Sequence, residues 1–138
     1  MTAYLLDTNV VSELMTNAPH ESVIHFLANL TGSYLSVITL HELHYGLALL
    51  PDGQRQKTIA SKLQTLLADY NEYIIPVTQA VAMYAAELRA IAKQQGRVVH
   101  LADALIASTA KVHDLVVATR NTNDFIDLGV DLFNPWTV

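Results

Sequence analysis

Acidic side chains follow the ends of several short apolar runs in this sequence. Asp7 comes directly after the run 4–6, and Glu42, Asp103 and Asp124 lie near other predicted element ends. Carboxylate oxygens are the ligands that hard divalent cations such as Mg²⁺ prefer. A cation held in this way lowers the pKa of water and stabilises charge on a reacting phosphate. The residue types therefore point to metal-assisted hydrolysis.

The elements that must position these side chains follow an α/β pattern. Short β-branched runs alternate with stretches of helical periodicity, which predicts a parallel sheet covered by helices. We expect strands over 4–6, 34–38, 73–77, 115–119 and 131–133. We expect helices over 10–15, after Pro19, and over 40–49, 55–70, 79–95 and 101–113, with a short helical turn near Asp124.

This topology gathers the acids at one place. In an open parallel sheet, ligands bind beyond the carboxyl ends of the strands. Asp7, Glu42, Asp103 and Asp124 are therefore expected to meet in one cleft. Like charges held close together raise each other's pKa values, so such a cluster needs a compensating cation, for which Mg²⁺ or Mn²⁺ is the expected choice.

Each acid also has a purely structural interpretation. Asp7 suits the N-cap of a following helix. Thr39 and Glu42 have the spacing of a capping box, which satisfies the first backbone N–H groups of a helix. Asp103 could serve the helix dipole in a first turn, and Asp124 could cap a short helix. Four such coincidences at one sheet edge favour the metal site over four separate caps.

Bulk composition sets limits on the class of protein. The 138 residues suit one domain, 1–138, and contain no cysteine. We find neither a signal peptide nor an apolar run of the about 18 residues that a membrane span needs, so we expect a cytoplasmic protein without membrane contact. The net charge of −5 disfavours nucleic-acid binding unless bound metal offsets the acidic cluster.

Several stretches resemble the motifs of PIN-domain nucleases. The opening Tyr-Leu-Leu-Asp-Thr-Asn-Val resembles that family's first motif, in which a strand delivers an Asp followed by Thr-Asn. Further stretches resemble the second, third and fourth motifs, and the ending Phe-Asn-Pro-Trp is typical of the VapC and FitB branch. In order, these stretches are 4–10, 35–43, 102–110, 117–125 and 133–136.

The resemblance implies a three-layer α/β/α domain with a mainly parallel sheet of about five strands. It implies a toxin of a toxin–antitoxin pair that cleaves RNA with Mg²⁺ or Mn²⁺. Its partners would be a VapB- or FitA-like antitoxin, DNA only through that antitoxin, and a second copy of the chain in a homodimer. By matching position, Asp7, Glu42 and Asp103 would be the catalytic metal ligands. Asp124 is expected as the fourth, because Asn121 stands where some relatives carry Asp.

Other residues of these motifs have secondary roles in this interpretation. Thr8 and Asn9 are expected to orient Asp7 or contact phosphate, or else to form hydrogen bonds at a helix start. Arg120 could contact phosphate, and Asn121 is expected to line the site. Trp136 is expected to be a packing or interface residue.

Two other functions remain open at this point. The chain could act mainly as a regulatory subunit that, with a DNA-binding antitoxin, controls their operon. It could also be a phosphatase-like or DNA-directed hydrolase that uses the same acids. Which RNA would be cut is not encoded in any motif, because base recognition depends on loop shape.

Overall fold

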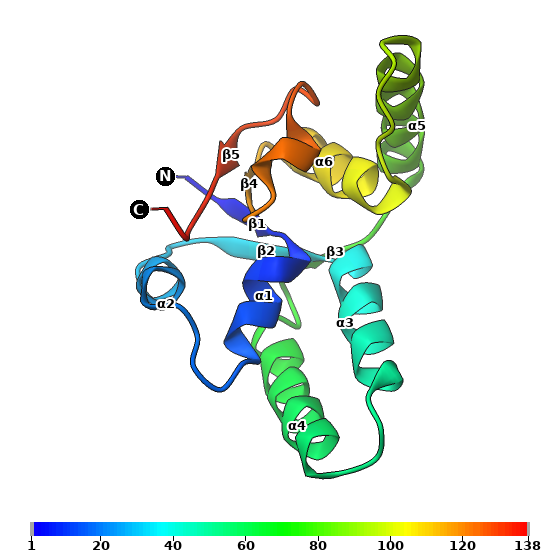
Figure 1. Ribbon diagram of the computed structural model, residues 1–138. Helices are drawn as coiled ribbons and strands as arrows, with labels where there is room; N and C mark the ends of the chain where they lie inside the picture. Colours follow the sequence, from blue (N-terminus) through cyan, green and yellow to red (C-terminus); the bar gives the residue numbers. More distant parts are fainter. Residues whose placement is uncertain (1, 138) are drawn as a thin grey trace.

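Five parallel strands form the middle layer of the computed structural model, which describes residues 2–137 (Figure 1). Their order across the sheet is β3-β2-β1-β4-β5, and every neighbouring pair is parallel. The expected parallel sheet of about five strands is confirmed. The strands are β1 (Tyr4–Leu6), β2 (Ser33–Ser36), β3 (Ile74–Ile75), β4 (Val116–Ala118) and β5 (Leu132–Phe133).

Helices cover both faces of this sheet, which gives the three layers that were expected. In Figure 1 the helices of the first half of the chain lie below the sheet, and those of the second half lie above it. The lower helices are α1 (Thr8–Leu14), α2 (Glu21–Ala28), α3 (Val37–Leu49) and α4 (Gln54–Asp69). The upper helices are α5 (Gln79–Gln94) and α6 (Leu101–His113), and a 3₁₀ turn, η1 (Thr122–Phe125), follows β4.

Alternating side chains of the strands build a core on each face of the sheet. Leu5 belongs to the buried cluster between the sheet and the helices α5 and α6. Its neighbour Leu6 belongs to the cluster between the sheet and the helices α1 and α2. Both leucines are fully buried, and burying one such side chain contributes about 1.5–3 kcal/mol. The two clusters fix the central strand, and with it the position of Asp7 at the strand's carboxyl end.

The start of α3 differs from the prediction. Strand β2 ends at Ser36, and residues 37 and 38 are helical rather than extended. Ser36 is the N-cap, because its Oγ accepts a hydrogen bond from the N–H of Ile38 at 3.0 Å. Thr39 is buried inside the helix, so the capping-box interpretation of Thr39 and Glu42 is wrong. Glu42 lies in the second turn, where no helix-end N–H group requires it.

Other boundaries shift by smaller amounts. Helix α1 begins at Thr8 rather than near residue 10, and Asp7 is its N-cap as expected. Strand β3 is shorter than 73–77, because Pro76 has no N–H to donate to a ladder, and it lies at the edge of the sheet. Asp124 lies inside η1, whose N-cap is Asn121, so the capping role for Asp124 is wrong.

Helix α6 has the predicted bounds, 101–113. Across residues 2–137, no helix has the length and apolar character that a membrane crossing requires.

Candidate active site

The carboxyl ends of neighbouring strands open onto one cavity of about 460 Å³. Strand pairing brings the ends together, since the N–H of Asp7 donates to the carbonyl of Ala118 at 2.9 Å. The cavity is lined by Asp7, Thr8, Asn9, Ser12, Glu13, Thr16, Glu42, Asp103, Arg120, Asn121 and Trp136. Seven of the eight residues singled out from the sequence are in this group, and Asp124 is the exception.

Asp7 is the most constrained acid of the cavity. Only 7% of its surface is exposed. Its Oδ1 accepts a hydrogen bond from the N–H of Thr8 at 2.9 Å. Its Oδ2 accepts from the hydroxyl of Thr119 at 2.9 Å and from Nδ2 of Asn9 at 3.3 Å. The carboxylate is thereby held in one orientation before any ligand binds.

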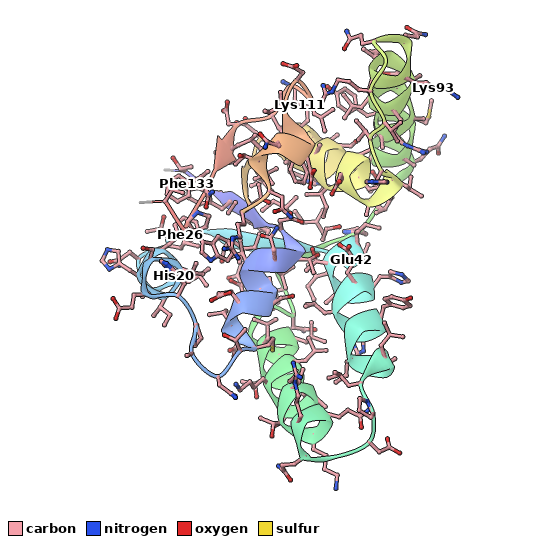
Figure 2. The ribbon with its side chains drawn as sticks, viewed as in Figure 1. His20, Phe26, Glu42, Lys93, Lys111 and Phe133 are labelled. Carbon is pink, nitrogen blue, oxygen red and sulfur yellow. The ribbon has the colours of Figure 1, made fainter. Side chains whose placement is uncertain are left out.

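Glu42 is tied to the same strand end through Thr8. The hydroxyl of Thr8 donates to Oε1 of Glu42 at 2.7 Å, and it also lies 3.4 Å from the hydroxyl of the buried Thr39. This contact joins the first turn of α1 to the second turn of α3. Figure 2 shows Glu42 near the sheet end of α3, on the side that faces α1.

Asp103 lines the cavity, whereas the fourth predicted acid, Asp124, does not. Asp103 lies in the first turn of α6, half-buried, and lines the cavity from the upper layer. Asp124 is exposed and is not among the lining residues, whereas Asn121 is. The structure thus brings Asp7, Glu42 and Asp103 to one cavity and leaves Asp124 at its periphery.

The pKa values of Asp7 and Asp103 are both raised. Burial is the main cause of the raised pKa of Asp7, and the charges of Glu42 and Asp124 add to it, although hydrogen bonds from Thr119 and Thr8 act in the opposite direction. The pKa of Asp103 is raised from 3.8 to about 6; burial is the largest cause, the charges of Asp7, Asp124 and Glu42 also raise it, and His100 lowers it. The cavity therefore concentrates negative charge that the folded chain does not fully compensate.

In residues 2–137, no Lys, Arg or His side-chain nitrogen lies within 4.0 Å of these carboxylates. Within residues 2–137, the single ion pair closer than 4.0 Å joins Arg97 to Asp127, outside the cavity. In the same part of the chain, no set of three His, Asp or Glu side chains is arranged to hold a metal ion by itself. Mg²⁺ is commonly bound through one or two carboxylates and keeps several waters. The donor set therefore fits a hydrated cation, completed by water or substrate oxygens.

Thr119 is a site residue that sequence reasoning missed. It is fully buried at the end of β4, and its hydroxyl bonds to Asp7, Asn9 and the N–H of Asn121. In the sequence it closes an apolar run and resembles any strand-end threonine. Its position directly before Arg120 and Asn121 was the available signal, because a strand end beside the Asp7 strand must face the same cavity.

A comparison with known protein families gives one match along most of the chain. The model for the PIN domain matches residues 4–130. The chain belongs to the PIN-domain family. The four stretches that resemble PIN motifs supply Asp7, Glu42, Asp103 and Asp124.

Curated relatives of this PIN domain include bacterial toxins. It is 42% identical over 135 residues to toxin FitB of Neisseria gonorrhoeae, covering 96% of this chain and 97% of that protein. It is 38% identical over 135 residues to VapC ribonuclease Y4jK of Sinorhizobium fredii, covering 96% of each. These similarities extend over nearly the full length of both partners.

Solved structures share the fold. A crystal structure of FitAcB from Neisseria gonorrhoeae superposes with a TM-score of 0.91 at 41% identity, covering 98% of this chain and 99% of that one. The structure of VapBC2 from Rickettsia felis bound to a DNA fragment from their promoter superposes with a TM-score of 0.83 at 28% identity, covering 96% and 98%.

The raised pKa of Asp103 predicts a pH-dependent stability for the metal-free PIN domain. The folded state binds this proton more tightly than the unfolded state, so the stabilisation is complete below about pH 4 and is lost as the pH rises through about 6. The Asp103→Asn variant cannot lose that proton. We therefore expect its melting temperature, relative to wild type, to rise between about pH 4 and pH 7 and then level off.

Thermal melts in EDTA, followed by circular dichroism, measure this difference. An unchanging difference across the pH range would show that Asp103 does not carry the shifted proton.

Proposed function

We propose that this chain is a metal-dependent endoribonuclease and the toxin component of a VapBC-type toxin–antitoxin pair. The observation that carries the proposal is the single cavity in which Asp7, Glu42 and Asp103 meet without an ion-pair partner. The relatives support the choice of reaction, since one is named a VapC ribonuclease and another a tRNA(fMet)-specific endonuclease. The reaction would take place in the cytoplasm.

In this proposal, Asp7, Glu42 and Asp103 would hold Mg²⁺ or Mn²⁺ together with water or substrate oxygens that complete its coordination, and Asp124 adds negative charge from the periphery. The bound ion would supply a lowered water pKa and stabilisation of charge on phosphate oxygens. The chain itself supplies orientation. Asn9 and Thr119 fix Asp7, and the remaining carboxylate oxygens orient the attacking water. The oxygen of that water bonds to phosphorus and gives up a proton to solvent, while the bond to the 3′ oxygen breaks and that oxygen takes up a proton to become a hydroxyl.

The direct test is cleavage of RNA by the purified chain. Single-stranded RNA, folded RNA and DNA of the same sequence are each incubated with Mg²⁺ or with EDTA. We expect internal cuts in RNA with Mg²⁺ alone. Cutting of DNA or release of phosphate from monoesters would instead indicate the phosphatase-like or DNA-directed hydrolase. If no substrate is cut under any condition, the enzymatic proposal is wrong.

A groove beside the active site suits an inhibitory partner. It has a volume of about 530 Å³, lies between α1, α3 and α4, and shares Ser12, Thr16 and Glu42 with the acidic cavity. We propose that a VapB- or FitA-like antitoxin lays a basic tail in this groove and pairs an arginine with the carboxylates, because a guanidinium binds carboxylates bidentately. Replacing each tail arginine by alanine and assaying cleavage in the complex tests charge pairing against simple steric cover.

The same antitoxin would connect the chain to DNA. Structural relatives include FitAB bound to a DNA fragment and VapBC2 bound to promoter DNA. This observation favours regulation of the operon as a second function, carried out by the complex. DNA contact would be made by the antitoxin, since this chain has a net charge of −5.

We also propose that the chain forms a homodimer. The apolar face of α4 is covered within the molecule, because its large apolar side chains are at least half-buried. Exposed large apolar residues lie on α3, on α5, in the loop between α5 and α6 and at the start of α6: Tyr45, Leu49, Met83, Ile91, Val98 and Leu101. Contiguous exposed apolar surface usually marks an interface.

Light scattering at micromolar concentration should therefore give twice the chain mass, and Leu49→Lys should shift it toward the monomer. A wild-type monomer would contradict the dimer.

A further inference from the structure

The acidic cavity has a cation on its rim, and that cation is stacked on an aromatic ring. The guanidinium carbon of Arg120 lies 5.2 Å from the centre of the Trp136 ring. Both side chains line the cavity that contains Asp7 and Glu42. Among the lining residues that the structure describes, Arg120 is the only Lys, Arg or His. Arg120 is exposed and Trp136 is half-buried, so the pair faces solvent at the cavity mouth.

The guanidinium forms no ion pair with the acids that line the same cavity. Although Asp7, Glu13, Glu42 and Asp103 line the same cavity, no carboxylate oxygen in residues 2–137 lies within 4.0 Å of Arg120. A ring beneath a guanidinium holds the plane flat through cation–π attraction. The N–H donors then point outward from the edges of that plane, in the fork that matches a phosphate group.

Both members of the pair are fixed relative to Asp7. The backbone N–H of Arg120 donates to Oδ1 of Asn9 at 3.2 Å, and Nδ2 of the same Asn9 donates to Asp7 at 3.3 Å. The backbone N–H of Trp136 donates to Oδ1 of Asn134 at 2.9 Å, and its ring packs against the core cluster of the lower layer. The distance from the guanidinium to the carboxylates is therefore set by the fold.

We propose that Arg120 binds a backbone phosphate of the substrate RNA at the cavity mouth, and that Trp136 is a positioning residue that holds the guanidinium for this contact. The inference rests on the proposed ribonuclease function. A polyanion that approaches four carboxylates needs a compensating contact, and Arg120 is the lining side chain able to make one. Trp136 thus has a role beyond the packing expected from the sequence.

The first experiment measures binding of a short single-stranded oligoribonucleotide in an Asp7→Asn background, where no cleavage is expected. Arg120→Ala should weaken binding about tenfold, the usual scale of a charge-assisted hydrogen bond. It should also reduce the slope of log K against log salt by about 0.7, the value for one phosphate of a single strand. Arg120→Lys should keep the wild-type salt slope, because the charge remains. It should lose most of the affinity that Arg120 contributes, because lysine lacks the planar fork.

Lys93→Ala is the charge-matched control. Lys93 lies on α5, far from Glu42 in Figure 2, so its loss should change neither affinity nor slope. If Arg120→Ala and Lys93→Ala have the same effect, Arg120 makes no specific phosphate contact and the proposal is overturned.

A double-mutant cycle tests the role of Trp136. Trp136→Leu should weaken RNA binding several-fold when Arg120 is present and should have no further effect in Arg120→Ala. An equal loss in both backgrounds would mean that the ring contacts RNA itself, and would overturn the positioning role. Trp136→Phe keeps an aromatic ring and should be milder. If Trp136→Leu fails to fold, the same cycle is measured with Trp136→Phe.

Intrinsic fluorescence gives an independent readout, because Trp136 is the only tryptophan of the chain. Arg120→Ala should shift its emission in the free protein, and RNA should change the emission of the Arg120 form more than that of the Ala form. These binding measurements separate the two hypotheses. Absence of cleavage with an intact Arg120 effect defeats the ribonuclease proposal alone. Cleavage in wild type with unchanged KM in Arg120→Ala defeats the phosphate contact alone.

Discussion

Asp7→Asn is expected to abolish metal-dependent RNA cleavage while the fold persists. Loss of a residue that only supports a metal ligand costs about 10- to 100-fold, so loss of a buried ligand carboxylate should cost more than about 100-fold. The variant loses a charge that raises the pKa of Asp103, and this relief favours the metal-free fold. It also gives up one of the hydrogen bonds from Thr8, Asn9 and Thr119, worth about 0.5–1.5 kcal/mol.

Because the two effects oppose each other, we expect the free energy of unfolding in EDTA to stay within about 1 kcal/mol of wild type. Urea denaturation measures it, and a labelled RNA with Mg²⁺ measures turnover. Asp52→Asn, in the exposed loop between α3 and α4, makes the same chemical change outside the cavity and should be silent in both assays. Wild-type turnover in Asp7→Asn would remove Asp7 from the metal site.

Glu42→Gln is expected to abolish most RNA cleavage with almost no change in the free energy of unfolding. Glutamine keeps an Oε1 that can accept the hydrogen bond from the Thr8 hydroxyl, and no cap is lost, because Ser36 caps α3. The free energy of unfolding should therefore change by less than about 1 kcal/mol. Only the negative charge disappears. If Glu42 binds the cation, cleavage should fall more than about 100-fold.

The matched control is Glu72→Gln, which alters an exposed glutamate in the turn after α4. Isothermal titration with Mn²⁺ adds a readout that does not depend on turnover, and Glu42→Gln should bind Mn²⁺ more weakly than Glu72→Gln does. A Glu42→Gln enzyme with full activity would leave Glu42 as a structural residue that merely joins α3 to α1.

The sheet and most helices could be predicted because their patterns are local. Alternation of apolar runs with helical stripes is visible in the sequence, and Gly96, with φ of +79°, ends α5 where expected. The start of α3 could not be predicted in the same way. Val37 and Ile38 are β-branched and extend an apolar run, so local propensity favours strand. The helix begins earlier because the Ser36 hydroxyl accepts the N–H of Ile38.

The acidic residues of the site could be predicted from the sequence. The residues that orient these acids were harder to predict. A charged residue after a strand is conspicuous, and Asp7, Glu42 and Asp103 do share a cavity. Thr119 is inconspicuous, because its role depends on β4 lying beside β1, a pairing across more than a hundred residues. Asn121, which directly precedes η1, lines the cavity, whereas Asp124, inside η1, is not among the lining residues.

The contacts of Thr119 give the hydrogen bonds around Asp7 a fixed direction. A hydroxyl has one proton to give and two lone pairs to share. Both lone pairs accept, from Asn9 at 3.3 Å and from the N–H of Asn121 at 3.0 Å, so the proton can only point at Oδ2 of Asp7. That oxygen already accepts two hydrogen bonds, so a proton on Asp7 would have to sit on Oδ1, which accepts only from the N–H of Thr8. The Thr119 hydroxyl has no second acceptor to turn to, so an arriving cation would meet a carboxylate whose Oδ2 is already fixed in orientation.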